Sequence, residues 1–337
     1  MTLQNTNTLK KQVAAYEKST TKESIWQMIN TIGPFIALWY LAYISLSVSY
    51  WLSLVPIVIA AGFFIRIFII FHDCTHHSFF KHRRTNRIVG TAMGVLTLFP
   101  FDRWGNEHAI HHATSGNLDK RGTGDIWTLT VDEYLKAPLS LRLAYRFYRN
   151  PLVMFGLGPI FEFLLKNRLN RKEAKKKERM NTYLTNVLIL ALSGLLSLLV
   201  GWQAFLLVHG SIFLLAGSLG IWLFYVQHTF EDSYFEENKD WEYVKAAVEG
   251  SSFYKLPKPI QFLTGNIGFH HVHHLSPRVP NYKLEEAHTN TPPLQNVPSI
   301  SLATSLKSLR FRLWDEKNKN FLSFKDVKAL AKNRASI

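Results

Sequence analysis

Two long apolar stretches dominate the pattern of hydrophobic and polar positions along this chain of 337 residues. The first covers about residues 32–71 and is interrupted by polar residues at 49–53, and the second covers about 183–226 with a break at 201–203. Each stretch is long enough for two helices of about 20 residues, the length that crosses a bilayer. The pattern therefore predicts an all-α integral membrane fold with four transmembrane helices in two hairpins.

The charged residues orient these hairpins. Lys and Arg outnumber Asp and Glu by 39 to 24, which gives a formal net charge of +15. The basic residues concentrate at 81–87 and 166–179, whereas neither hairpin tip carries a charge. Because Lys and Arg are enriched in cytoplasmic loops, both tips should face outward and both termini should lie in the cytosol. Such a charge would suggest nucleic acid for a soluble protein, but the apolar stretches favour a membrane protein with no nucleic-acid partner.

The rest of the chain is predicted to lie at or beyond the cytoplasmic membrane surface. The apolar segments 88–101 and 151–165 are too short or too interrupted to span, so we interpret both as interfacial or re-entrant. Residues 1–30 are expected to form a polar cytosolic segment without a signal peptide. Residues 31–337 are expected to form a single membrane domain, whose polar part from about Phe230 onward caps the cytoplasmic face. Arg66, inside the second span, should snorkel or pair within the bundle.

Histidines are the most informative polar residues of the chain. Ten of the 14 form three clusters beside the predicted spans: His72, His76 and His77; His108, His111 and His112; and His270, His271, His273 and His274. On a helix, positions three or four apart share a face, so each cluster offers two or three imidazoles to one point. The predicted topology places all three clusters on the cytoplasmic side. His228 emerges from the fourth span at the same boundary and can reach the same centre.

This set of imidazoles indicates a metal site. It contains more ligands than one tetrahedral zinc ion uses, which suggests two metal ions, and imidazole suits iron, zinc and copper alike. A pair such as His111 and His112 often lies in a solvated loop. Three clusters of similar spacing on one membrane face argue against that interpretation. The single cysteine, Cys74, excludes a disulfide or an iron–sulfur cluster built by this chain alone. His82, His209 and His288 are predicted to be solvated, packed and structural, respectively.

Five motifs carry these histidines: FHDCTH from Phe71, HAIHHAT from His108, NLDKRGTGDIW from Asn117, YVQHTFED from Tyr225 and GNIGFHHVHH from Gly265. With them, nearly the whole chain resembles the membrane fatty acid desaturase family, and within it the bacillar acyl-lipid Δ5 desaturases. In that family nine histidines hold a di-iron centre. The resemblance assigns this role to His72, His76, His108, His111, His112, His228, His270, His273 and His274. His77 and His271 stand beside these positions, and either could replace a neighbour.

The resemblance implies an O₂-dependent enzyme of the bacterial cell membrane that inserts a cis double bond, at Δ5, into saturated acyl chains of membrane phospholipids. Its cofactor would be two iron ions, which zinc can replace in a purified sample. The sequence has no haem-domain signature, cysteine cluster or GxGxxG loop, so two electrons must come from a separate carrier such as ferredoxin or flavodoxin. Residues 166–179 contain eight basic and two acidic residues, and this segment could dock an acidic carrier or bind anionic lipid headgroups.

Other residues and functions remain open at this stage. Metal-bound histidines usually donate their second N–H to an acceptor, and nearby acids that could serve are Asp73, Glu107, Asp125 and Glu231. Each could equally be an ordinary solvated acid. Trp104 and Trp127 could line an acyl tunnel or anchor the protein at the interface. The alternative functions are a histidine-box hydroxylase or ketolase, and a non-catalytic membrane metal-binding protein.

Overall fold

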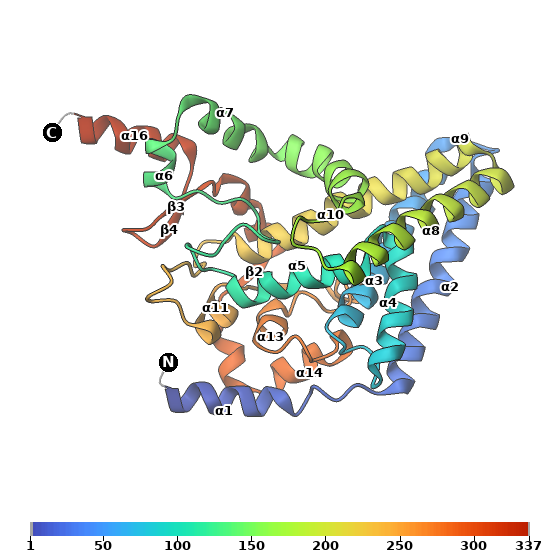
Figure 1. Cartoon of the computed structure of the whole chain (residues 1–337), viewed down its shortest axis with the longest axis horizontal. Coiled ribbons are helices and arrows are strands. Elements are labelled where there is room, and N and C mark those ends of the chain that lie inside the picture. Colours follow the sequence, from blue (N-terminus) through green and yellow to red (C-terminus); the bar gives the residue numbers. More distant parts are fainter. Residues whose placement is uncertain (1–2, 336–337) are drawn as a thin grey trace.

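Four long helices form two hairpins in the computed structural model, which describes residues 3–335 (Figure 1). The first hairpin pairs α2 (Thr21–Ser45) with α3 (Tyr50–Thr75). The second pairs α8 (Lys176–Val200) with the continuous run of α9 (Trp202–Phe205), η4 (Leu206–Gly210) and α10 (Ser211–His228). All four are long and apolar enough to cross a membrane, and no other described helix is. The predicted spans and their pairing are confirmed.

Two helix starts differ from the apolar boundaries. The helix α2 begins at Thr21 and α8 begins at Lys176, whereas the apolar stretches begin near residues 32 and 183. The additional turns are polar because they lie beside the cap rather than among lipid. Ser24, for example, is fully buried and donates to the Phe79 carbonyl oxygen at 2.5 Å. Hydropathy therefore marks the lipid-facing part of each helix and not the whole helix.

The most enclosed span is α3, which packs against α2, α4 and α10. Arg66 lies on its buried face and donates from Nε to Thr31 Oγ1 at 3.0 Å. It also donates to the Phe262 carbonyl oxygen, and its guanidinium lies 3.8 Å from the centre of the Phe262 ring. This confirms that Arg66 pairs inside the bundle, where a charge facing lipid would be costly.

Neither short apolar segment is among the candidate membrane spans of the described residues. Residues 88–97 lie in α4 (Arg83–Thr97), whose 15 residues cover about 22 Å, less than the roughly 30 Å of a bilayer core. Gly90 lets α4 pack closely on α3, because a Cβ there would lie 2.8 Å from the Cys74 Cβ. Residues 151–165 form two π-helical segments, η1 (Val153–Leu157) and η2 (Ile160–Leu165), which pack along α10.

The remaining elements form a cap at one end of the two hairpins (Figure 1). Its helices near the hairpins are α5 (Phe101–Thr114), α11 (Tyr243–Glu249) and α13 (His270–Leu275). The helix α1 (Leu3–Ala14) packs Leu9 and Val13 into a core with α11 and α13. Two pairs of short strands, β1 with β2 and β3 with β4, add a small β component that the sequence did not predict.

The other elements of the cap are short. They are α6 (Val131–Lys136), α7 (Leu139–Tyr148), η3 (Lys166–Arg168), β1 (Phe253–Lys255), α12 (Lys258–Leu263), η5 (Asn281–Lys283), α14 (Leu284–Thr289), η6 (Pro292–Asn296), β2 (Ser299–Ser301), α15 (Leu302–Ser305), η7 (Leu306–Arg310), β3 (Leu313–Asp315), β4 (Asn320–Leu322) and α16 (Phe324–Ala335). Both ends of the described chain lie on the cap side, away from the hairpin tips (Figure 1).

Candidate metal centre

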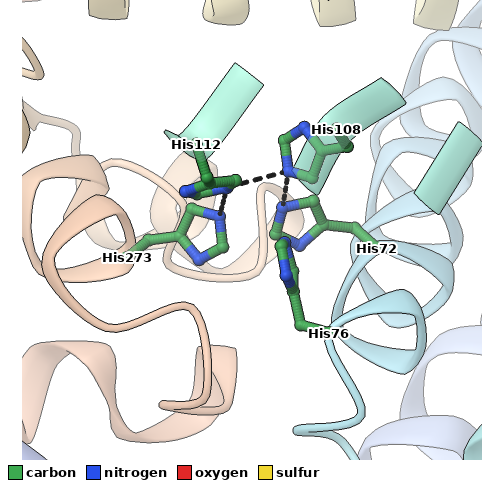
Figure 2. A group of neighbouring side chains, drawn as sticks. All are labelled: His72, His76, His108, His112 and His273. Atoms are coloured by element: carbon green, nitrogen blue, oxygen red, sulfur yellow. Dashed lines mark hydrogen bonds between the residues drawn. The ribbon is translucent and has the colours of Figure 1, made fainter. Parts of the chain in front are cut away.

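Four elements bring nine histidine side chains to one place between the hairpins and the cap. The helix α3 ends there, α5 presents three histidines on consecutive turns, α10 ends there, and the short α13 presents three more. One group of potential ligand atoms, all within 4.8 Å of one another, comes from His72, His76, His108, His112 and His273. Figure 2 shows these five rings pointing toward a common point.

A second group lies beside the first. Potential ligand atoms of His111, His228 and His274 also lie within 4.8 Å of one another. His270 joins this group, since its Nε2 is 2.9 Å from the Nε2 of His228. The nine positions that the family resemblance singled out are therefore brought together by the fold, in two adjacent groups.

Hydrogen bonding alone cannot satisfy the second group. A neutral imidazole carries a proton on only one nitrogen. The Nδ1 of His111 faces Asp125 Oδ1 at 2.5 Å and the Nδ1 of His228 faces the Gly250 carbonyl oxygen at 3.3 Å, so both Nδ1 atoms carry the proton. Their two Nε2 atoms then face each other at 3.2 Å with lone pairs and no hydrogen between them. A bound cation would remove this repulsion.

The first group presents the same conflict. The Nδ1 of His72 lies 2.9 Å from Asp73 Oδ1, which leaves its Nε2 without a proton. The Nε2 of His108 lies 3.0 Å from the Nε2 of His72 and 3.1 Å from that of His112. The Nε2 of His112 in turn lies 2.9 Å from that of His273. A protonated ring nitrogen donates but cannot accept, so three successive contacts among four such nitrogens cannot all be hydrogen bonds. The donor set therefore fits metal ions better than it fits protons.

Burial keeps these rings in the form that binds metal. Burial lowers the pKa of His76, His108, His112 and His273 well below the ordinary 6.5, and the neighbouring imidazoles lower it further. The Nε2 of His76 is buried and has no hydrogen-bond partner among the described residues. Neutral imidazole is the ligand form of histidine, so the environment favours metal binding near neutral pH.

An apolar cavity of about 580 Å³ reaches this group of rings. Its walls come from α3, α5, α10 and the η1–η2 segment, and His72, His108 and His270 lie at the end of it that meets the rings. The volume falls within the roughly 300–1,000 Å³ of sites that enclose a small molecule. Trp104 lines the cavity and stacks on His108 with ring centres 4.3 Å apart. An apolar chain in this cavity would contact the rings directly.

Comparison with known proteins agrees with this geometry. Residues 49–299 match the family model described as fatty acid desaturase. The chain is 65% identical over 320 residues to a fatty acid desaturase of Bacillus subtilis, which covers 95% of this chain and 91% of that protein. This chain belongs to the fatty acid desaturase family.

More distant relatives share part of their length with this desaturase. An sn-1 oleoyl-lipid 12-desaturase of Synechocystis is 28% identical over 231 residues, 66% of this chain and 63% of that protein. An sn-1 acyl-lipid omega-3 desaturase (ferredoxin) of Nostoc is 27% identical over 235 residues, 66% of this chain and 62% of that protein. This desaturase is thus an oxidoreductase of fatty acyl chains, with four candidate membrane spans and histidine groups that fit a metal site.

Two of the four acids predicted to orient histidines do contact them in the desaturase. Asp73 and Asp125 accept from the Nδ1 atoms of His72 and His111. The prediction is wrong for the other two. Glu107 pairs with Arg103 at 3.3 Å and lies 3.9 Å from Arg171. Glu231 is two-thirds exposed and pairs with Lys307 at 3.0 Å.

The two additional histidines lie outside both groups. His77 is exposed, and its backbone has a φ of 57°, a left-handed conformation that turns its ring toward Phe101. The Nε2 of His271 lies 3.0 Å from the Nδ1 of His288, and neither of the two ligand groups includes it. Neither therefore replaces a neighbour in the geometry of the two groups.

The isolated histidines and one tryptophan can also be placed. His82 is exposed at the start of α4, and His209 packs between Phe64 and Phe205, as the sequence suggested. Trp127 does not line the cavity but packs against Tyr145 and Tyr148. Phe224 was not predicted to belong to the site, yet its ring centre lies 5.1 Å from those of His111 and His228. Its position one turn before His228 could have revealed it.

Proposed function

We propose that this desaturase inserts a cis double bond at Δ5 into saturated acyl chains of membrane phospholipids, using O₂ and two electrons from a separate carrier. The observation that carries the proposal is the apolar cavity that ends on the histidine rings. The Δ5 position follows from the resemblance to bacillar desaturases. The carrier is proposed to be ferredoxin or flavodoxin, and the first of these is supported by the name of the Nostoc relative.

We further propose that the nine histidines hold two iron ions, one in each group. When bound, the iron pair supplies the redox chemistry that activates O₂. His72, His76, His108, His112 and His273 would hold one ion, and His111, His228, His270 and His274 the other. Overall, two hydrogens leave neighbouring carbons of the chain, and O₂ takes these with two electrons and two protons to give two waters.

The protein's own contribution is binding and orientation. The apolar cavity wall binds the acyl chain and excludes water from it. Asp73 and Asp125 hold the rings of His72 and His111 with their Nε2 atoms facing inward. Trp104, stacked on His108, fixes one side of the path along which the chain meets the rings. A fixed chain position relative to the rings is what selects one pair of carbons.

Lipid profiling of a bacterial host that expresses the protein tests this function. Gas chromatography with mass spectrometry of derivatised fatty acids should show new Δ5 monounsaturated chains in the phospholipid fraction. The matched control is the His108→Ala variant, which should reach the membrane in equal amount and give no such product. Hydroxylated chains in place of alkenes would establish the hydroxylase alternative. No new fatty acid from an iron-loaded protein supplied with reduced ferredoxin would refute the proposal.

We also propose that the cap and both termini face the cytosol of a bacterial cell. The basic segments lie at the cap end of the hairpins and the uncharged tips at the other, which supports this orientation. Reporter fusions after Ser49 and Gly201 should read as external, and fusions after Arg87 and Arg179 as cytosolic. An external signal at Arg87 would contradict the orientation.

A further inference from the structure

The histidine groups are buried except at one edge. Eight of the nine histidines are buried, and only His76 is partly exposed. His76 directly follows the last residue of α3, and the next residue, the exposed His77, turns the chain outward. Among the nine histidines, His76 is therefore the one that is not fully buried in the described structure.

Basic residues from two helices surround this edge. The ring of His77 and the guanidinium of Arg87 lie 6.3 and 5.7 Å from the centre of the Phe101 ring. The amide of Asp102, the next residue, donates to Asn181 Oδ1 on α8 at 2.9 Å. Arg83 and Arg87 come from the first turns of α4, and Lys177 from the first turn of α8. Although 94 residues apart in sequence, the starts of these two helices therefore flank the same two histidines.

Most of these charges are not used inside the protein. Seven exposed basic side chains lie at or just before the starts of α4 and α8, and none forms an ion pair with a described residue: Lys81, Arg83, Arg84, Lys172, Lys175, Lys176 and Lys177. We call these seven residues with His76 and His77 the basic rim. Arg87 is different, because it binds both oxygens of Asp102 at 2.7 Å.

The basic rim is unfavourable for the fold itself. Positive charges in the first turn of a helix oppose the helix dipole, and like charges on adjacent turns repel each other. The first turn of α4 contains no acid, and the one acid in the first turn of α8, Glu178, is buried and bonded to Asn106 and Arg171. Local stability does not explain these charges, whereas an acidic partner would.

We propose that the basic rim is the docking surface of the electron carrier, a small acidic protein that transfers one electron at a time. This inference rests on the proposed function, which requires two external electrons for each double bond. A docked carrier would be oxidised and would pass its electron through His76 to the metal centre. Complementary charge raises the rate of encounter and sets the orientation of docking, and the effect weakens with salt.

Anionic lipid is the competing occupant, because His76, His77 and the start of α4 directly follow the candidate span that ends at Thr75. The position of the rim relative to the metal ligands favours the carrier. The rim surrounds the one partly exposed histidine of the site, where a redox partner would have its shortest path. A lipid headgroup would gain nothing from that proximity.

Charge reversal tests the proposal. The double variant Arg83→Glu, Lys177→Glu would be reconstituted in neutral phosphatidylcholine vesicles and assayed for alkene formation at increasing concentrations of reduced ferredoxin. We expect the KM for ferredoxin to rise by roughly tenfold or more with kcat unchanged, and its salt dependence to flatten. The matched control is Lys325→Glu, Lys328→Glu, which reverses two exposed charges on α16 at the far side of the cap and should behave as wild type.

The outcomes distinguish a failure of the proposed function from a failure of the docking proposal. If the wild-type protein forms no alkene with saturating carrier, the proposed function fails. If it does, and both double variants share its KM, the docking surface is refuted. If the charge-reversed variant loses activity only in vesicles with anionic lipid, and its KM for ferredoxin is unchanged, the basic rim binds lipid. That result would also refute the docking proposal. If the reversed protein does not fold, the milder Arg83→Gln, Lys177→Gln variant should raise KM in the same direction.

Discussion

The contact between Asp125 and His111 provides the sharpest test of the metal assignment. Asp125 Oδ1 lies 2.5 Å from His111 Nδ1, and Asp125 Oδ2 accepts from the Gly122 amide at 3.0 Å. The change Asp125→Asn keeps the shape of the side chain and one acceptor oxygen but removes its negative charge. Hydrogen bonds to a charged acceptor are about twice as strong as neutral ones, so the ring should become both less basic and less firmly oriented.

The expected magnitude follows from the position of the contact. Loss of such an acceptor typically lowers metal affinity about 10–100-fold, or about 1.4–2.8 kcal/mol. Since the amide retains one acceptor, we expect about tenfold for Asp125→Asn and more for Asp125→Ala. Asp125 contacts only the second group of rings, so one ion should be lost before the other. Metal content should fall from about two ions per chain to about one as chelator concentration increases.

The assay is metal analysis of the purified protein after equilibration with graded chelator, together with alkene formation. The matched control is Glu231→Gln, which alters another acid near the histidines in sequence but removes only an exposed pair with Lys307. Glu231→Gln should keep both ions and full activity. Equal metal loss in the two variants, or none in Asp125→Asn, would refute the assigned role of Asp125.

Three further predictions follow from the same geometry. His228→Ala should abolish double-bond formation with normal membrane insertion, whereas His82→Ala should keep most activity; comparable activity would remove His228 from the ligand set. Gly220 lines the cavity with open space where a Cβ would lie, about 12 Å along α10 from His228, so Gly220→Leu should shift products toward shorter acyl chains. Lipid profiling checks this, with Gly194→Leu, on the exposed side of α8, as the unaffected control. Burial lowers the pKa of His108, His112, His273 and His274 below the unfolded value of 6.5, so at these four positions only the unfolded chain takes up protons as pH falls below 6.5. The melting temperature of the metal-free protein should therefore be lower at pH 5.5 than at pH 7.5, and an unchanged value would contradict this.

Apolar length and histidine spacing predicted the spans and three histidine clusters at one site, but not the division of the rings into two groups. Apolar length identified four crossings because lipid imposes its thickness on sequence. The three- and four-residue spacing of His108, His111 and His112 was informative because α5 is a regular helix through all three positions. Apolar length and histidine spacing are both local features of the sequence. Each predicted the structure correctly because no tertiary contact changes the helices concerned.

Roles that depend on distant partners could not be predicted in the same way. His77 and His271 share the local spacing of their clusters, but a left-handed residue turns the first away and His288 binds the second. Glu107 is adjacent in sequence to His108, yet it is Asp125, 14 residues beyond His111, that reaches a ring. Adjacency in sequence does not determine where a side chain on a helix points. A loop can bring an acid back to a histidine ring many residues earlier in the chain.

The contacts that hold the ligand-bearing elements in place do not involve the ligand nitrogens. Asp73 Oδ2 accepts from the backbone and side-chain nitrogens of Asn281 at 2.6 and 2.8 Å, which ties the end of α3 to the cap. Gln227, beside His228, donates to the Ile267 carbonyl oxygen at 2.7 Å, and Tyr243 donates to that of His274 at 2.8 Å. The positions of α3, α10 and α13 are thus fixed by bonds that persist without metal. Replacing one imidazole should therefore remove a ligand without displacing the others, so loss of activity in such variants reports on the metal centre rather than on unfolding.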